Sequence, residues 1–268
     1  MIFNKFFILF KIGRKIGKSN IINIVSETHK IPVFVKLFFN LLAFSFSSSN
    51  NTKSKGKENL SESIQEMGTT FIKLGQFLAT RPDIIGEKLS KELESLQDKL
   101  PPFSKKEAEK IIIENLGQSN FDDIIDLSEP IAAASIAQVH KAKIKEDNII
   151  KNVAIKVLRP NIKKIFNDEI DAIMLLAYIV ESLISKTKRL KLIEVVFLFK
   201  EITNHEMDLR FEAAAANEYA ENTKNDLGFF VPKIYWNFTS ESVLTLDWVD
   251  GVSTVSYTHL RAHETQRY

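Results

Sequence analysis

The chain has 268 residues, of which 44% are hydrophobic and 26% are charged, and its formal net charge is +2. This composition is typical of a globular protein with one large domain or two small ones, and not of a disordered chain. There is no cysteine, which excludes disulfides, thiolate zinc sites and cysteine nucleophiles, and the small net charge argues against a nucleic-acid partner.

The first 46 residues form a basic and strongly apolar arm. Residues 1–57 contain ten Lys or Arg against the single acid Glu27, together with "FFILF" and "IPVFVKLFFNLLAFSF". Basic charge beside bulky apolar residues indicates a membrane surface. The second run has 16 residues, fewer than the roughly 20 that span a bilayer. A helical arm packed on the rest of the protein is the alternative, and the sequence leaves both open.

Residues 47–59 are polar and of low complexity and are expected to form a linker. A helical extension follows over 60–125. Its first helix is predicted from about Leu60 to Thr80, and a second lies within 81–103, stopped by two prolines. A third covers roughly 104–116, with Ser104 as its N-cap and Gly117 at its end. The first helix carries one apolar face: Ile64, Met67, Phe71, Leu74 and Leu78.

Over 126–254 the pattern changes to short strands and long helices, which predicts an α+β fold. "PIAAASIAQVHKAKI" and "NVAIKVL" read as adjacent strands joined by a polar turn. Helices are predicted over 162–186 and 192–222, and two further strands over 231–238 and 242–251. Three strands, a helix and two strands is also the chain order of a protein-kinase small lobe, but many α+β domains share it.

Lys156 ends the apolar strand "VAIK" and is the first candidate for chemistry. Such a lysine is usually a solvated edge residue, whereas in a kinase-like site it contacts nucleotide phosphates and is positioned by a helix glutamate. The helix-forming stretch 205–222 offers Asp208 and Glu212, which are four residues apart and share one face of a continuous helix. Opposite a buried lysine these acids would be its partners, and losing one would cost about 3–5 kcal/mol.

A second candidate is "KLGQ", residues 73–76. In the predicted helix Lys73 and Gln76 are neighbours on a different side from the apolar face, which is also what a solvated flank would show. Gly75 lies mid-helix, where glycine costs about 1 kcal/mol relative to alanine. A close-packing contact or a functional role is therefore expected for it.

Taken together and in this order, four stretches resemble the UbiB family of atypical kinase-like proteins. They are "GTTFIKLGQFLATRPDIIGEKLSKELESLQDKLPPF", "EPIAAASIAQVHKAKI", "VAIKVLRPNI" and "HEMDLRFEAAAANEYAEN". The resemblance extends from about Leu60 to Gly251 and includes "LTLDWVDG", which is similar to the family's last small-lobe strand and hinge. It implies a protein-kinase-like small lobe preceded by the helical extension.

The resemblance also implies roles. An alanine-rich loop takes the place of a glycine-rich phosphate loop, and because each Cβ restricts the backbone, three alanines predict a stiffer loop. Lys73 would lie across the site, facing Glu206 and Asp208 of an E-x-D motif. The implied nucleotide-binding residues are Ala132, Ala133, Ala134, Ser135, Lys156, Glu212, Asp247, Trp248 and Val249; the implied regulatory ones are Lys73, Gly75, Gln76, Glu206 and Asp208.

The sequence contains no H-x-D-x-x-x-x-N catalytic loop and no D-F-G motif. We therefore expect that the large lobe is absent, that these residues hold no catalytic or metal-binding group, and that they do not hydrolyse ATP by themselves. Residues 255–268 resemble a translated sequencing adaptor and are left out of the fold prediction. His259 and His263 fall in that tail, and the isolated His29, His140 and His205 are expected to be structural or solvated.

The family resemblance implies an atypical kinase or ATPase that binds ATP or ADP, uses Mg²⁺ in its full-length form and supports ubiquinone biosynthesis. It places the protein at the cytoplasmic face of a bacterial inner membrane, with biosynthetic proteins or lipid intermediates as partners. A non-catalytic scaffold on the membrane surface is the competing hypothesis. An aminoglycoside- or choline-type phosphotransferase is more distant, because it has no need of the K-x-G-Q motif.

Overall fold

The computed structural model describes residues 2–19, 21, 22, 24, 37, 60–96, 100–183 and 185–251. The linker predicted over 47–59 and the tail at 255–268 lie outside these residues. The elements, in chain order, are α1 Ile2–Lys18, α4 Leu60–Met67, α5 Thr69–Ala79, α6 Pro82–Ile85, α7 Glu87–Glu94, α8 Lys105–Leu116, α9 Gln118–Asp122, β1 Ile124–Ile125, β2 Pro130–Ala133, β3 Ala137–Glu146, β4 Ile149–Leu158, α10 Ile162–Leu183, a 3₁₀ helix Ser185–Leu190, α11 Leu192–Glu206, α12 Leu209–Asn222, a 3₁₀ helix Trp236–Phe238 and β5 Val243–Asp247.

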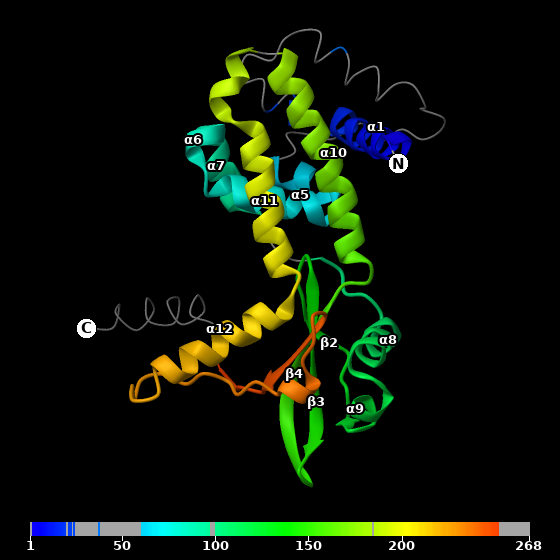
Figure 1. Cartoon of the computed structure of the whole chain (residues 1–268), viewed down its shortest axis with the longest axis vertical. Coiled ribbons are helices and arrows are strands. Elements are labelled where there is room, and N and C mark those ends of the chain that lie inside the picture. Colours follow the sequence, from blue (N-terminus) through cyan, green and yellow to red (C-terminus); the bar gives the residue numbers. More distant parts are fainter. Residues whose placement is uncertain are drawn as a thin grey trace, which may run out of the picture.

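The chain folds into an α+β structure in which α1, α5–α7, α10 and α11 gather at one end of the long axis. An antiparallel sheet lies at the other end, with α8, α9 and α12 beside it (Figure 1). The strand order is β1-β3-β4-β5, and β2 pairs with β3 beside β1. The predicted α+β class is thus confirmed. The hairpin of β3 and β4 turns at Asp147 and Asn148, whose φ angles of 51° and 61° are those of the two-residue turn that suits twisted strands.

Both faces of the sheet are covered. On one face, α10, α11 and α12 pack over a core that includes Phe166, Phe199 and Leu244. On the other, α8 and α9 cover Ile144, Ile155 and their neighbours. In the second half of β4, Val153, Ile155 and Val157 are buried on one face, while Ala154 and Lys156 on the other face are only partly buried.

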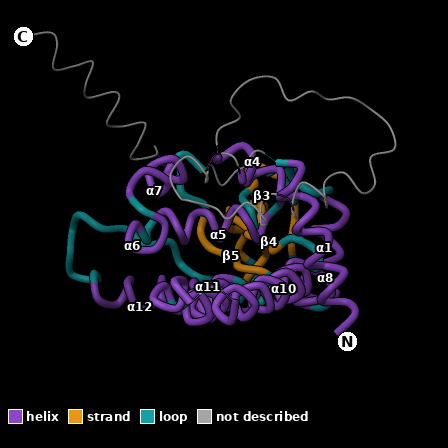
Figure 2. The backbone as a smooth tube through the Cα atoms, turned by 90° about the horizontal axis from the view of Figure 1, so that it is seen from above, coloured by secondary structure: helices purple, strands orange, loops and turns teal. Residues whose placement is uncertain are grey.

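The helix α5, which carries the K-x-G-Q motif, lies in the middle of the helical part. Figure 2 shows α10, α11 and α12 along one edge of the molecule and α4 and α7 toward the other, with α5 between them. Leu74 and Phe77 of α5 pack against the sheet-side core, where the rings of Phe77 and Phe199 are 5.6 Å apart. This packing fixes α5 relative to α11.

The predicted helix over 60–80 is divided in two at Gly68. The φ angle of Gly68 is 105°, a value that L side chains rarely adopt, so the glycine is required at this break. The predicted apolar face still lies inward, since Met67 and Phe71 are buried against α1 and α10. The helix predicted within 81–103 likewise consists of the two short helices α6 and α7.

Two predicted elements are wrong. The helix over 192–222 is interrupted at Met207 and Asp208, so that α11 and α12 point in different directions (Figure 1). The strand predicted over 231–238 is reduced to a single bridge between Ile234 and Leu246. Pairing stops there because the chain closes a 3₁₀ turn, in which the Phe238 N–H donates to the Tyr235 carbonyl at 3.0 Å.

The N-terminus of α8 is confirmed as predicted, and it allows a test of stability. The Ser104 side chain accepts a hydrogen bond from the Glu107 N–H while the Glu107 carboxylate accepts one from the Ser104 N–H. Replacing Ser104 by alanine should lower the free energy of unfolding by about 1 kcal/mol. Urea unfolding of Ser104→Ala measures this, with Lys106→Ala on the exposed side of the same helix as the control. Equal midpoints for the two variants would contradict the contribution of the cap.

Candidate functional site

The central feature of the candidate site is an ion pair between the sheet and α12. The Lys156 ammonium, on β4, donates to both carboxylate oxygens of Glu212, at 3.0 and 2.7 Å. The two side chains are 26% and 51% exposed, so this pair is open to solvent and not buried. Its contribution to stability is therefore below about 1 kcal/mol, and the larger cost expected for a buried pair does not apply.

A second ion pair joins α5 to the C-terminal end of α11. Lys73 Nζ lies 2.9 Å from Glu206 Oε2, and the Lys73 side chain is only 15% exposed. Lys73 is thus largely covered and bound to the first acid of the E-x-D motif, and is not part of a solvated flank. The pair connects the helical extension to the same helix junction from which Glu212 projects.

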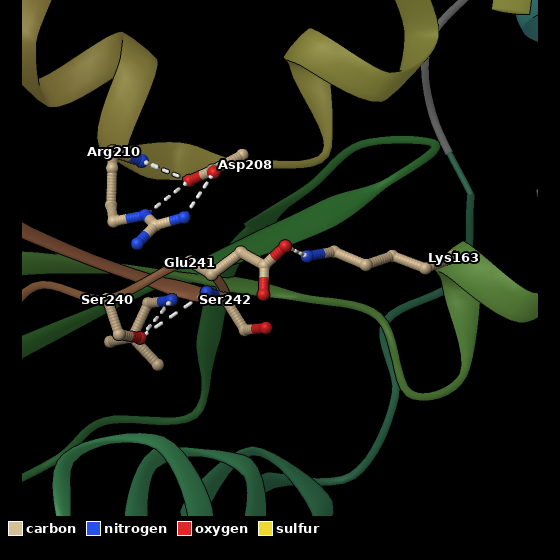
Figure 3. A network of polar contacts seen from close by, with 7 residues as sticks. Lys163, Asp208, Arg210, Ser240, Glu241 and Ser242 are labelled. Carbon is tan, nitrogen blue, oxygen red and sulfur yellow. Dashed lines mark hydrogen bonds and ion pairs between the residues drawn. The ribbon is translucent and has the colours of Figure 1, made fainter.

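Asp208, the other acid of that motif, serves a different purpose. Its carboxylate caps α12 by accepting from the Arg210 N–H at 3.1 Å, and it also accepts from the Arg210 guanidinium at 2.9 and 2.7 Å (Figure 3). These hydrogen bonds hold the pKa of Asp208 below its ordinary value. Asp208 is therefore engaged with its own helix, whereas Glu206 faces Lys73.

The start of α12 is also tied to the turn before β5. The Leu209 N–H donates to the Glu241 carbonyl at 2.9 Å, and the Glu241 carboxylate forms an ion pair with Lys163 of α10 (Figure 3). A cavity of about 400 Å³ lies beside this junction and is lined by Lys163, Asp208 and Glu241, among others. Glu201 and His205 of α11 also line it.

The alanine-rich stretch is only in part a loop. Ala132 and Ala133 belong to β2 and pair with Val139 and Gln138 of β3. The turn itself begins at Ala134, whose N–H donates to the Ala137 carbonyl at 2.8 Å, and it includes Ser135, which is buried. The stiffness expected from three alanine side chains therefore concerns mainly Ala134, since strand pairing already holds the first two.

The end of β5 provides backbone groups at the expected hinge. The N–H groups of Asp247 and Trp248 donate to the backbone carbonyls of Lys233 and Asn152, respectively, each at 3.0 Å. The Asp247 carboxylate accepts from the buried Tyr235 hydroxyl at 2.6 Å, and burial together with this carboxylate raises the pKa of Tyr235. Within the described residues the N–H of Val249 has no acceptor, so it is a group that a ligand could bind.

Two polar residues near the site, Gln138 and Arg159, were not assigned a role from the sequence, and His140 was expected only to be structural or solvated. Gln138 and Arg159 bind backbone groups of the turn and of the segment that precedes α8, and His140 binds the Ser128 carbonyl. Two features of the sequence could have pointed to these residues. Gln138 and His140 lie two residues apart, so they share one face of a predicted strand, and Pro101 and Pro102 cannot donate backbone hydrogen bonds, so their segment needs other partners.

Comparison with known proteins identifies the family. Residues 95–268 match the ABC1 atypical kinase-like domain, a range that also covers the C-terminal tail. The chain belongs to the ABC1/UbiB atypical kinase-like family. It is 33% identical over 236 residues to a probable protein kinase UbiB of Cellvibrio japonicus, which covers 88% of this chain and 42% of that protein. The proteins of the same name from Pseudomonas aeruginosa and Tolumonas auensis are 30% and 36% identical, covering 96% and 77% of this chain and 48% and 38% of theirs.

The chain thus spans less than half of the length of each of these UbiB relatives. Among the described helices, none is long and apolar enough to cross a membrane. Across the same described residues there is also no group of three or more His, Asp or Glu side chains that could hold a metal ion.

Gly75 of the K-x-G-Q motif allows a test of whether it is a packing residue. A Cβ at this position would overlap Cδ1 of Leu96, which is buried beside Leu60 and Leu93. Replacing Gly75 by alanine should lower the free energy of unfolding by about 1–3 kcal/mol through overpacking, less the gain in helix propensity. Thermal or urea unfolding of Gly75→Ala measures this.

The matched comparison is the double variant Gly75→Ala/Leu96→Ala. If the clash is the cause, adding Gly75→Ala to Leu96→Ala should cost less than adding it to the wild type. Equal costs in the two backgrounds would show that the clash with Leu96 is not the reason for glycine here.

His140 allows a test of pH dependence. It is fully buried; its Nδ1–H donates to the Ser128 carbonyl at 2.8 Å, and its Nε2 accepts from the Gln138 amide at 2.9 Å. Burial lowers its pKa below 6.5, although the Ser128 carbonyl and Glu129 act in the opposite direction. Because the unfolded chain then binds the proton more readily, stability should fall as the pH drops below 6.5, by at most about 1.4 kcal/mol per pH unit.

Urea unfolding of the wild type and of His140→Gln, each between pH 7.5 and pH 5, isolates this effect from the other histidines. The slope of stability against pH should be smaller in the variant. Parallel curves would exclude His140 as the titrating group.

Proposed function

We propose that this chain binds ATP or ADP as the nucleotide-binding part of an atypical kinase or ATPase. The observation that supports the proposal most directly is the Lys156–Glu212 ion pair between a strand of an antiparallel sheet and the helix packed beside it. In a protein-kinase small lobe, a strand lysine is held by a helix glutamate in this way and contacts the nucleotide phosphates. Membership in the ABC1/UbiB family and the UbiB relatives, which are named as probable protein kinases, support the same assignment.

In this proposal each part of the site has a defined task. Glu212 orients the Lys156 ammonium toward the phosphates. The turn at Ala134 and Ser135 lies over the phosphates, and backbone groups from Asp247 to Val249 bind the edge of the adenine. The helix with the K-x-G-Q motif packs against α11 and is joined to it by the Lys73–Glu206 pair. There it would obstruct a protein substrate and thereby regulate access, with Gln76 on the same helix.

Magnesium is expected for the full-length protein, but the described residues offer no group of ligands for it. Since the sequence also contains no catalytic-loop or D-F-G motif, we propose that these 268 residues bind nucleotide without hydrolysing it.

The wider role follows from the family resemblance. We propose that the whole protein supports ubiquinone biosynthesis at the cytoplasmic face of a bacterial inner membrane, with lipid intermediates or biosynthetic proteins as partners.

A second candidate function is a membrane-surface scaffold that uses the same fold without nucleotide. It is favoured by α1, on which the exposed Phe7 and Phe10 lie beside the basic residues Lys11 and Arg14, although Ile12 of the same helix is buried against α10. The scaffold does not require Lys156 to bind a ligand, so nucleotide binding separates the two functions.

Calorimetric titration of the 268-residue chain with ADP and with ATP tests the first function. Lys156→Ala should weaken binding tenfold or more, or about 1.4 kcal/mol, while its free energy of unfolding should change by less than about 1 kcal/mol because the ion pair is partly exposed. Lys145→Ala, an exposed lysine at the far end of β3, is the control and should bind like the wild type.

Phosphate release should be absent in all three proteins. A wild type that binds neither nucleotide, or a Lys156→Ala variant that binds as tightly as the wild type, would contradict the proposal and favour the scaffold. Phosphate release that disappears in Lys156→Ala would contradict the proposed lack of turnover.

A further inference from the structure

The segment Leu100–Phe103 connects the helices of the K-x-G-Q extension to α8, and side chains from the sheet hold it in place. Two of its residues are prolines, which lack a backbone donor. At Phe103 the Gln138 amide replaces a strand partner: its oxygen accepts from the Phe103 N–H at 2.9 Å and its NH₂ donates to the Phe103 carbonyl at 3.2 Å. The segment is therefore bound to β3 without being part of the sheet.

Gln138 is fixed in this position by buried partners. It and His140 are fully buried, and the amide NH₂ also donates to His140 Nε2 at 2.9 Å. His140 in turn donates to the Ser128 carbonyl. Because the amide and the imidazole both have partners in this arrangement, the chain of hydrogen bonds gives the segment a rigid anchor.

Arg159 binds the same segment at Pro101 and also binds the alanine-rich turn. Its Nε and Nη2 donate to the Ala134 carbonyl at 3.1 and 2.8 Å, and its Nη1 donates to the Pro101 carbonyl at 3.0 Å. The backbone N–H of Arg159 donates to the Ile136 carbonyl at 2.8 Å, so both sides of the turn are held. Arg159 thus joins the turn, the end of β4 and the segment Leu100–Phe103.

We propose that Arg159 is a positioning residue that couples the alanine-rich turn to the segment Leu100–Phe103. The planar guanidinium presents donors in several fixed directions, so it can bind the two carbonyls at once, whereas a lysine ammonium is a single point. Without it, the Ala134 and Pro101 carbonyls have no common partner, and the turn and the segment can move separately. The inference rests on the proposed function, because the turn that Arg159 holds is the one proposed to lie over the phosphates.

The coupling has a reciprocal consequence. A nucleotide that orders the turn at Ala134 also orders the segment at Phe103, although Phe103 makes none of the proposed nucleotide contacts. Displacing this segment in turn loosens the turn and weakens nucleotide binding by the same factor.

Amide hydrogen exchange of the 268-residue chain without nucleotide tests the coupling. In Arg159→Gln, exchange at the Ala134 and Phe103 amides should accelerate together, about tenfold, while amides in the centre of the β3–β4 hairpin remain as in the wild type. The matched control is Arg81→Gln, at an arginine of the extension whose guanidinium binds Asp83. This control variant should leave the exchange rates of the Ala134 and Phe103 amides unchanged. Acceleration at one amide alone, or at neither, overturns the proposal.

A second variant covers the case in which Arg159→Gln unfolds the protein. Arg159→Lys keeps the charge and most of the aliphatic stem but not the planar fork. It should also accelerate both amides, and wild-type exchange at both in this variant overturns the proposal.

Repeating the exchange with saturating ADP separates this inference from the proposed function. In the wild type, ADP should slow exchange at both Ala134 and Phe103; in the Arg159 variant that remains folded, it should slow Ala134 alone. Slowing at both amides in the variant overturns the coupling. If ADP has no effect on the wild type, the proposed nucleotide function fails, while the nucleotide-free comparison still decides whether Arg159 joins the two segments.

Discussion

The interruption between α11 and α12 is the constraint on which the candidate site depends. The Asp208 carboxylate starts a new helix, and the Leu209 N–H bonds to the Glu241 carbonyl and not to a helical partner. In a single continuous helix, Glu206 and Glu212 would lie six residues apart, well over one turn. Because the chain changes direction between them, each glutamate meets a different lysine: Lys73 from the extension and Lys156 from the sheet.

The two ion pairs are therefore related through one helix junction, although neither contributes much to stability by itself. Each contains a partly exposed glutamate, and such pairs contribute on the order of 1 kcal/mol or less. What holds the junction is the apolar core beneath it, where Met207 and Leu209 are buried with Phe166 and Phe199. The ion pairs thus set the direction of two side chains, while the position of the helices is set by burial.

The sequence predicted what is decided locally. Ser104 and Gly117 mark the ends of α8, and Asp147 and Asn148 mark the hairpin turn, because capping and turn residues act on their immediate neighbours. The partnership of Lys156 with a helix glutamate was also foreseen, through the resemblance to a family. The K-x-G-Q residues were found in the same way, but only the structure shows that Lys73 is largely covered and that Gly75 packs against Leu96.

The two wrong predictions of secondary structure have a common physical origin in contacts between distant parts of the chain. Residues 205–222 are good helix formers throughout, and nothing within them reveals that Leu209 will bond to Glu241. The strand predicted over 231–238 has strand-like residues, but the side chain of Tyr235 reaches Asp247 and the backbone closes a 3₁₀ turn after the first bridge. In both cases tertiary hydrogen bonds override local propensity.

Contacts with distant residues also change the interpretation of the alanine-rich stretch. Read as a sequence, three alanines in place of glycines suggest a loop stiffened by its own side chains. In the structure, Ala132 and Ala133 are paired with β3, and the carbonyl of Ala134 is bound by Arg159, 25 residues further along the chain. The conformation of the turn is thus determined mainly by strand pairing and by a distant guanidinium. A change at Arg159 is for this reason expected to alter the turn more than a change from alanine to glycine at Ala132 or Ala133.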